Sequence, residues 1–183
     1  FYVDIRLGRP VVDEDVNIIR RRSKGLLEFV ENYRKLTRIA PPVKVRISVK
    51  EFFADLKRLN PEPYIHFQLT DESLEWEADR AQMEQVFLNL LKNAREACAT
   101  VSEPSIQVLA ESNGKERIFI IQDNGEGILP DVLERIFIPF FTTKPSGSGI
   151  GLSLCKQIIT LHGGSISATS ENGQGSCFRI IFP

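Results

Sequence analysis

One stretch of the chain, residues 123–152, constrains the fold more than any other. It holds three motifs in order: D-N-G-E-G at 123–127, I-F-I-P-F-F-T-T-K at 136–144 and G-S-G-I-G-L at 147–152. Glycines at this density permit backbone turns and close approaches that side chains would block. The last motif opens a predicted helix, whose first N–H groups have no partners within the helix. We therefore expect the three motifs to fold around a common ligand.

The rest of the chain after residue 43 has the periodicities of an α/β domain. Alternating apolar residues predict strands over 43–49, 64–69, 105–110 and 117–122, and a closing hairpin formed by 165–170 and 176–182. Helical spacing predicts helices over 50–59, 79–99, 130–136 and 151–161. Before residue 16, Val3, Ile5 and Leu7 give only a weak strand signal.

Composition excludes several classes of protein. A chain of 183 residues, 42% hydrophobic and 26% charged, can form one well-cored domain with a short appendage. A net charge of −1 argues against nucleic-acid binding. No apolar run approaches the ~18 residues that a membrane helix needs, and Phe1 begins no signal peptide. Because the chain lacks an initiator Met, we expect a piece of a longer protein.

The cysteines indicate the compartment. Cys98, Cys155 and Cys177 are odd in number, widely spaced and set among apolar residues. We expect buried free thiols rather than a disulfide or a metal site, and therefore a cytosolic protein.

A helix predicted over 16–38 precedes the α/β domain. Six residues, most of them apolar, recur at alternating spacings of four and three, as in a coiled-coil seam: Ile19, Ser23, Leu26, Val30, Tyr33 and Thr37. The pattern ends at Pro41-Pro42, which predicts a boundary between a helical segment, 1–42, and a domain, 43–183. Packing on its own domain would explain the stripe, but we favour pairing with other helices in a dimer.

The helix predicted over 79–99 carries two unusual residues. Asp79 can cap it, with Gln82 completing a capping box. Asn89 and Asn93 lie one turn apart on the polar face that also carries Gln85 and Glu96. Asparagine is a mediocre helix former, and a merely solvated face would more typically carry Glu and Lys. We therefore predict a ligand-binding role for both asparagines.

The three motifs and this helix can together bind a nucleotide triphosphate. Asp123, fixed at a strand end, can accept a hydrogen bond from the exocyclic amine of adenine. Guanine would place a carbonyl at the same position, which cannot donate. Gly125 and Gly127 permit close approach, and the N-terminus of the helix at Gly151 can hold phosphate oxygens. Lys144 offers charge to the terminal phosphate, and residues 145–149 suit a mobile lid. A glycine-rich surface loop is the simpler alternative, but it does not explain four mutually consistent parts.

A magnesium ion fits the same set of residues. Mg²⁺ prefers oxygen ligands and retains several waters, so one or two neutral side-chain oxygens with the phosphates suffice. Asn93, with Asn89 beside it, can supply them. His66 on a strand and His162 at a helix end have ordinary explanations, as a solvent-facing residue and as a capping residue. Neither of the commoner phosphate-binding patterns, G-x-x-x-x-G-K-[ST] or the dinucleotide fingerprint, is present.

These motifs resemble those of the sensor histidine kinases of two-component systems. Q-V-F-L-N-L-L-K-N-A-R-E-A at 85–97 resembles their N box, and the motifs at 123–127, 136–144 and 147–152 resemble their first glycine box, F box and second glycine box. The resemblance covers residues 43–183. It implies the Bergerat ATP-binding fold, an α+β two-layer sandwich whose mixed, mostly antiparallel sheet packs on three helices, here preceded by a coiled-coil-like helix.

The resemblance also implies the site. It assigns Asn89, Asn93 and Lys144 to catalysis, Asn93 to magnesium, and the binding of ATP to a larger set: Asp123, Gly125, Gly127, Ile128, Phe140, Thr142, Thr143, Lys144, Gly147, Gly149, Ile150, Gly151 and Leu152. In the related gyrase-type ATPases the position of Asn89 is typically a glutamate that activates water. Asparagine there is more compatible with phosphoryl transfer to a protein.

The implied function is transfer of the γ-phosphoryl group of Mg-ATP to a histidine, for relay to a response-regulator aspartate. The implied partners are a receiver domain and a second copy bound through the 16–38 helix, with neither nucleic acid nor direct membrane contact. We expect a cytoplasmic domain, with a membrane anchor left open for the full-length protein. Neither His66 nor His162 fits the family's acceptor pattern, so autophosphorylation within this chain is not expected. A gyrase- or MutL-type ATPase clamp and a regulatory nucleotide-binding module are the alternatives.

Overall fold

The computed structural model describes residues 3–4, 9–10, 13–144 and 147–183. The chain divides into two compact units, residues 1–38 and 39–183. In the first unit, β1 (Val3–Asp4) pairs antiparallel with β2 (Arg9–Pro10), and α1 runs over Asp13–Thr37. The weak strand signal at the N-terminus thus corresponds to β1 at Val3, whereas Ile5 and Leu7 lie outside the described residues.

The predicted helix at 16–38 is confirmed as α1, which begins a few residues earlier. Most of its large apolar side chains are exposed, among them four of the predicted seam: Ile19, Leu26, Val30 and Tyr33. Val16, Ile18, Leu27 and Phe29 are exposed as well. Exposed apolar side chains at this spacing are typical of a helix that pairs with another helix. Pairing of α1 therefore remains a prediction.

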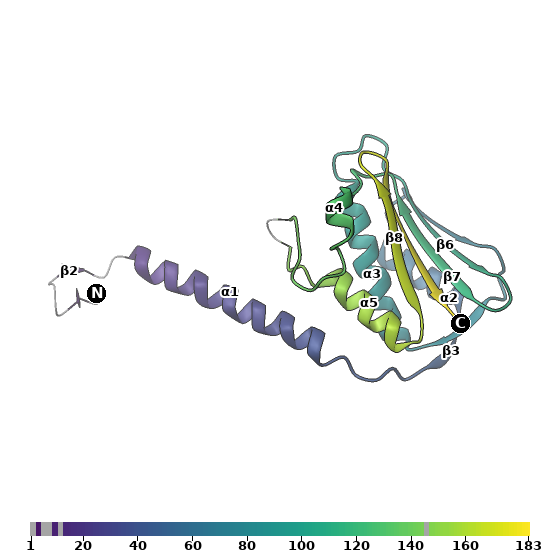
Figure 1. Cartoon of the computed structure of the whole chain (residues 1–183), viewed down its shortest axis with the longest axis horizontal. Helices are drawn as coiled ribbons and strands as arrows, with labels where there is room; N and C mark the ends of the chain where they lie inside the picture. The colour runs from purple at the N-terminus through teal and green to yellow at the C-terminus, as the bar shows by residue number, and fades with distance from the viewer. Residues whose placement is uncertain (1–2, 5–8, 11–12, 145–146) are drawn as a thin grey trace. The chain divides into compact units, whose positions relative to one another are not determined.

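The second unit is built on a five-stranded sheet with the order β4-β6-β7-β9-β8 (Figure 1). Its strands are β4 (Ile65–Leu69), β6 (Ile106–Ser112), β7 (Arg117–Asp123), β8 (Ser165–Glu171) and β9 (Gly175–Phe182). The pair β4–β6 is parallel and all other pairs are antiparallel. This is the mixed, mostly antiparallel sheet that was expected.

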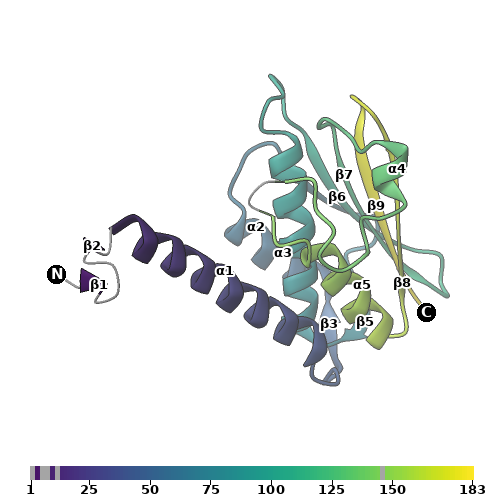
Figure 2. The same cartoon turned by 60° about the vertical axis from the view of Figure 1, so that its left-hand side comes forward.

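Three helices cover one face of the sheet: α2 (Val49–Leu59), α3 (Arg80–Ala97) and α5 (Gly151–Leu161) (Figures 1 and 2). The predicted stripe of α3 is buried against the sheet, comprising Met83, Val86, Phe87, Leu90, Leu91, Ala94 and Cys98. Phe87 contacts Phe52 of α2 and Phe119 of β7 at ring-centroid distances of 5.2 and 5.5 Å. Each such edge-to-face pair contributes about 0.5–1.5 kcal/mol beyond its buried area. The α+β two-layer sandwich is thus confirmed.

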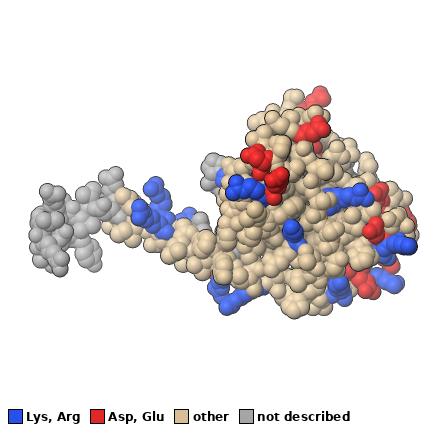
Figure 3. All heavy atoms as spheres, in the orientation of Figure 1, with Lys and Arg blue, Asp and Glu red and all other residues tan. Residues whose placement is uncertain are grey.

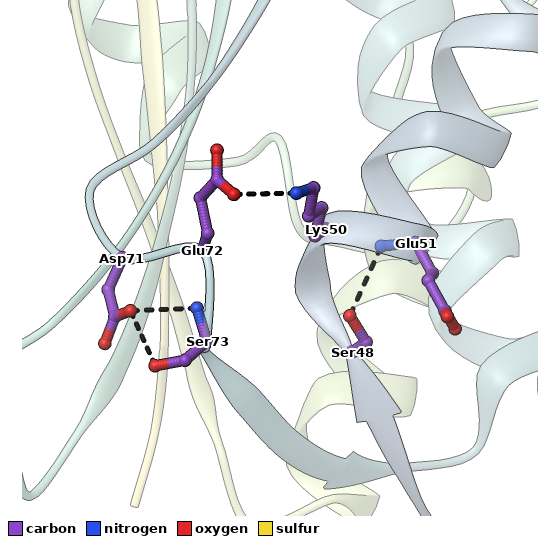
Figure 4. A network of polar contacts seen from close by, with 6 residues as sticks. All are labelled: Ser48, Lys50, Glu51, Asp71, Glu72 and Ser73. Atoms are coloured by element: carbon purple, nitrogen blue, oxygen red, sulfur yellow. Dashed lines mark hydrogen bonds and ion pairs between the residues drawn. The ribbon is translucent and has the colours of Figure 1, made fainter.

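A second, two-stranded sheet adjoins α2 and was only half predicted. It pairs β3 (Val45–Ser48) with β5 (Glu75–Ala78), and β5 was missed. Ser48 caps α2 by accepting a hydrogen bond from the Glu51 N–H at 3.4 Å, and Lys50 forms an ion pair with Glu72 at 2.6 Å (Figure 4). The ion pair connects the start of α2 to the turn at residues 71–73, where the Asp71 side chain accepts hydrogen bonds from Ser73.

Three local predictions were wrong. The helix expected over 130–136 is a single turn, α4 (Pro130–Leu133), followed by turns. The capping box is only half formed, because the Asp79 side chain accepts from the Gln82 N–H at 3.1 Å while the Gln82 amide donates to the Ala40 carbonyl instead. Cys98 and Cys155 are buried free thiols as expected, but Cys177 is half-buried because it lies on the outward face of β9.

The two histidines have structural roles consistent with expectation. His66 is exposed on β4, and His162 caps α5. The His162 ring is buried and accepts a hydrogen bond from the Asp79 N–H at Nε2, so its Nδ1 carries the proton that is donated to the Ile158 carbonyl. Asp79 also accepts from the Val43 N–H at 3.0 Å. The end of α5, the start of α3 and the chain entering the domain are thereby joined.

Candidate nucleotide-binding site

The polar face of α3 (Gln85, Asn89, Asn93 and Glu96) lies beside the three motifs of residues 123–152. Near the middle of α3, the Asn89 side-chain oxygen lies 3.9 Å from the position that a Cβ on Gly151 would take. Near its C-terminus, Glu96 forms an ion pair with Lys144. The next residue, Ala97, contacts Gly125. One helix face thus touches all three motifs, with Asn93 between the contact points.

Asp123 is a buried polar group of the site that three hydrogen bonds hold in place. It ends β7, is 3% exposed, and lies opposite Ser176 of β9. Its Oδ1 accepts from the N–H groups of Gly125 and Ser176 at 2.9 and 3.3 Å, and its Oδ2 accepts from the Ser176 hydroxyl at 2.5 Å. These bonds fix the carboxylate, and a carboxylate oxygen has a second lone pair with which to accept a further donor.

Glycines are required around Asp123 because other backbone approaches closely. A Cβ on Gly125 would lie 2.6 Å from the carbonyl of Ala97, and one on Gly127 would lie 2.1 Å from the carbonyl of Glu171. Gly127 also has φ of +72°, a conformation that side chains disfavour. The first glycine motif therefore packs between the end of α3 and the β8–β9 hairpin.

The turn of that hairpin holds the same loop from the other side. The Gly173 N–H donates to the Glu126 carbonyl at 2.7 Å. The Ser170 hydroxyl accepts from the Ile128 N–H at 2.8 Å and donates to the Gly175 carbonyl at 2.6 Å. Ile128, a predicted site residue, is thus positioned by a strand that lies far from it in sequence.

The second and third motifs are joined at Phe140 and Gly149. Both have positive φ, +64° and +67°, and the Phe140 N–H donates to the Gly149 carbonyl at 2.8 Å. A positive φ is uncommon for a residue with a side chain and is found chiefly where surrounding structure enforces it. A Cβ on Gly149 would lie 2.5 Å from the Phe140 carbonyl carbon, so the contact itself requires glycine.

The lysine-bearing segment turns back on itself before the last motif. The Thr142 hydroxyl accepts from the Lys144 N–H at 3.1 Å, and the Gly147 N–H donates to the Lys144 carbonyl at 3.1 Å. Thr143 is exposed. Residues 145–146 of the predicted lid lie outside the described residues.

The N-terminus of α5 faces the polar face of α3. Gly151 begins the helix, Ile150 before it is buried, and Leu152 is half-buried. Among the residues that the structure describes, no side chain caps this terminus. Its first N–H groups therefore remain available to an anion, which the helix dipole favours.

The donors present fit a magnesium ion that is held mainly by phosphates. Asn89 and Asn93 are both half-buried, and the Asn93 amide makes no hydrogen bond within the part of the chain that the structure describes. In that same part, no group of three or more His, Cys, Asp or Glu side chains could hold a metal by itself. Asn89 also contacts the buried Cys155 thiol, whose pKa burial raises to about 12.

Sequence reasoning missed several residues that form hydrogen bonds to the predicted site residues and position them. Ser170 and Ser176 were not singled out, although Ser176 supplies two of the three hydrogen bonds to Asp123. Asn124 was also missed: its side chain accepts from the Ser105 N–H and donates to the Glu103 carbonyl, both at 2.8 Å. The serine in G-S-C-F-R directly after Gly175 is the one available signal, since it opens the strand that pairs with β7.

Comparison with known proteins defines the class to which this site belongs. Residues 78–183 match the family described as "Histidine kinase-, DNA gyrase B-, and HSP90-like ATPase". The match covers α3, all three motifs and the closing hairpin, so the chain belongs to this ATPase family. Membership implies ATP binding.

Within the family, the chain is similar to sensor histidine kinases. It is 44% identical over 108 residues to sensor histidine kinase ZraS of Salmonella typhimurium, covering 58% of this chain and 23% of the relative. It is 31% identical over 200 residues to the sensory histidine kinase/phosphatase NtrB of Rhizobium leguminosarum bv. phaseoli, covering 97% of this chain and 52% of the relative. The chain thus spans between about a quarter and a half of these proteins.

A solved structure agrees in fold. The catalytic domain of histidine kinase ThkA is 32% identical, with a TM-score of 0.68 and coverage of 76% of this chain and 95% of that one. ThkA in complex with response regulator protein TrrA matches 99% of this chain and 54% of that chain, with 26% identity and a TM-score of 0.71. The Bergerat-type fold of residues 39–183 is therefore that of a histidine kinase catalytic domain.

Proposed function

We propose that this chain is the ATP-binding catalytic domain of a sensor histidine kinase, with a helix of the dimerisation region. Residues 43–183 would be the catalytic domain and residues 1–42 the helical segment. The observation that carries the proposal is the set of contacts between α3 and the three motifs, at Gly151, Lys144 and Gly125. The similarity to sensor histidine kinases supports it over an ATPase clamp of the gyrase type.

In this proposal the base lies against the buried end of β7. The Asp123 carboxylate accepts a hydrogen bond from the adenine amine, and Ser176 holds that carboxylate in place. The glycine loop at 125–127 shapes the pocket because its backbone contacts leave no room for side chains. Phe140, Thr142 and Thr143 belong to the wall that connects the base pocket to the phosphate end.

The phosphates lie between α3 and the N-terminus of α5. The backbone of residues 147–152 and the helix N-terminus hold phosphate oxygens, and Lys144 neutralises the terminal phosphate. Asn89 orients that phosphate, and Asn93 holds Mg²⁺, which when bound neutralises charge on the triphosphate. Positioning and charge neutralisation, rather than covalent catalysis by this domain, would then promote transfer to a histidine nitrogen.

The acceptor histidine and the partners complete the proposal. Neither His66, on a sheet edge strand, nor His162, buried as a helix cap, is placed as an acceptor. We propose that α1 pairs with a second copy through its exposed apolar side chains, and that a response-regulator receiver domain takes the phosphoryl group. The complex of ThkA with TrrA supports the second of these partners.

Surface charge and the cysteines bear on the proposed partners and location. On the face of residues 39–183 seen in Figure 3, acidic and basic side chains are interspersed. Across the described residues, no helix has the length and apolar character to cross a membrane. The free thiols of Cys98, Cys155 and Cys177 support our placement of the domain in the cytoplasm.

The test is phosphoryl transfer from γ-labelled ATP. The chain alone should bind ATP but incorporate no label, whereas a form extended by any native sequence that precedes Phe1 should acquire label that is stable in base and labile in acid, as phosphohistidine is. Asn93→Ala in the extended form should abolish labelling. Label that appears on neither form, with ATP hydrolysed to phosphate instead, would favour the clamp.

A further inference from the structure

Glu96 of α3 lies between two lysines. Its Oε2 forms an ion pair with Nζ of Lys144, and its Oε1 lies 3.8 Å from Nζ of Lys92, one helical turn earlier. The side chains of Glu96 and Lys144 are 40% and 42% exposed. An incoming polyanion can therefore reach this cluster without unfolding anything.

Glu96 neutralises Lys144, the residue that the proposed function assigns to the terminal phosphate. The lysine ends a segment that turns back on itself through Thr142, so the ion pair also holds residues 142–144 against α3. A triphosphate at the N-terminus of α5 would need the Lys144 charge and would be repelled by the Glu96 carboxylate. The Glu96 carboxylate and the triphosphate therefore compete for the ammonium group of Lys144.

We propose that Glu96 is a positioning residue that competes with the ATP triphosphate for Lys144. In the nucleotide-free chain, Glu96 neutralises Lys144 and holds residues 142–144 against α3. When the triphosphate takes Lys144, Glu96 is left with Lys92 as its counter-charge. Glu96 thus lowers the affinity of the site for the triphosphate. It also makes the position of residues 142–144 depend on whether ATP is bound. This inference rests on the proposed function.

The size of the effect follows from the exposure of the pair. Exposed ion pairs are weak, so removing the competitor should tighten binding of ATP by about two- to fivefold. The gain should decrease from ATP to ADP and vanish for adenosine, which has no phosphate to compete. Lys92→Gln should act in the opposite direction, because Glu96 would then have only Lys144 as its counter-charge.

Glu96→Gln in the whole chain tests the proposal, and Glu62→Gln is the matched control. Glu62 pairs with Arg95 at 2.8 Å, so this control removes the same charge from the ion pair of the neighbouring residue on α3. Calorimetric titration with ATP, ADP and adenosine should show the graded gain for Glu96→Gln only. Hydrogen exchange of the nucleotide-free chain should show faster exchange of a peptide covering residues 138–144 in the same variant.

The outcomes separate the two claims. If the parent chain binds ATP and Glu96→Gln binds it no tighter, or gains equally for adenosine, the competition is refuted while the proposed function stands. Unchanged exchange of residues 138–144 would refute the docking role. If the parent chain binds no ATP, the proposed function fails and the competition fails with it.

Discussion

Asp123→Asn changes the proposed base contact while conserving the shape of the side chain. The Asn oxygen should take the Oδ1 position, since the N–H groups of Gly125 and Ser176 both point there. The amide NH₂ must then occupy the Oδ2 position, where the Ser176 hydroxyl can rotate to accept from it. The fold should persist. An adenine amine approaching this side chain would, however, meet a donor instead of an acceptor.

The expected loss is that of a hydrogen bond to a charged group, about 1.5–3 kcal/mol. At about 1.4 kcal/mol per tenfold change, ATP should bind about 10- to 150-fold more weakly. ITP carries a carbonyl in place of the amine and should lose little or gain. Calorimetric titration of both nucleotides measures this, with Asp131→Asn as the control for loss of an exposed carboxylate outside the proposed pocket. An equal loss for ATP and ITP, or none for either, would refute the assignment of Asp123 to the base.

Four further substitutions test other parts of the account. Asn93→Ala should remove the magnesium-dependent part of ATP affinity; equal losses with MgCl₂ and with EDTA would contradict a metal role. Gly125→Ala should lower the free energy of unfolding by about 1–3 kcal/mol and weaken ATP binding, because its Cβ would lie 2.6 Å from α3 backbone. Gly114→Ala, with open space and φ of +87°, should be destabilising yet bind ATP normally, as urea titrations and calorimetry would show. The N–H groups of Val43 and Gln82 lower the pKa of Asp79, so its stabilisation is full above about pH 4 and is lost as the pH falls through the lowered value. Asp79→Asn should therefore flatten the acid side of the Tm-against-pH curve; parallel curves would contradict this.

Periodicity predicted most of the fold because the strands and helices are half-buried. The stripe of α3 and the alternation of β6, β7 and β9 are direct consequences of one face packing on a core. The failures occur where that signal is short. In β5 only Trp76 and Ala78 face inward, and they alternate with two glutamates over just four residues. The turn after Leu133 shows no pattern that distinguishes it from a longer helix.

The site was predictable to the extent that its residues are consecutive in sequence. The glycine motifs could be found because each is local, and the two asparagines could be found because they share one helix face. The support of Asp123 by Ser176 could not, because it depends on the register between β7 and β9. The same is true of Glu96 and Lys144, which meet only after the loop has folded back on α3.

The most direct measurement of the central claim is an amide NMR titration of the chain with a non-hydrolysable ATP analogue and Mg²⁺. The account predicts that the shifted resonances cluster along the polar face of α3 at 89–97, the loop at 123–128, and residues 140–144 and 147–152. The exposed edge strand β4 and its residue His66 should not shift. Shifts centred elsewhere on the domain, with the amides of Asn93, Gly125 and Gly151 unmoved, would contradict it.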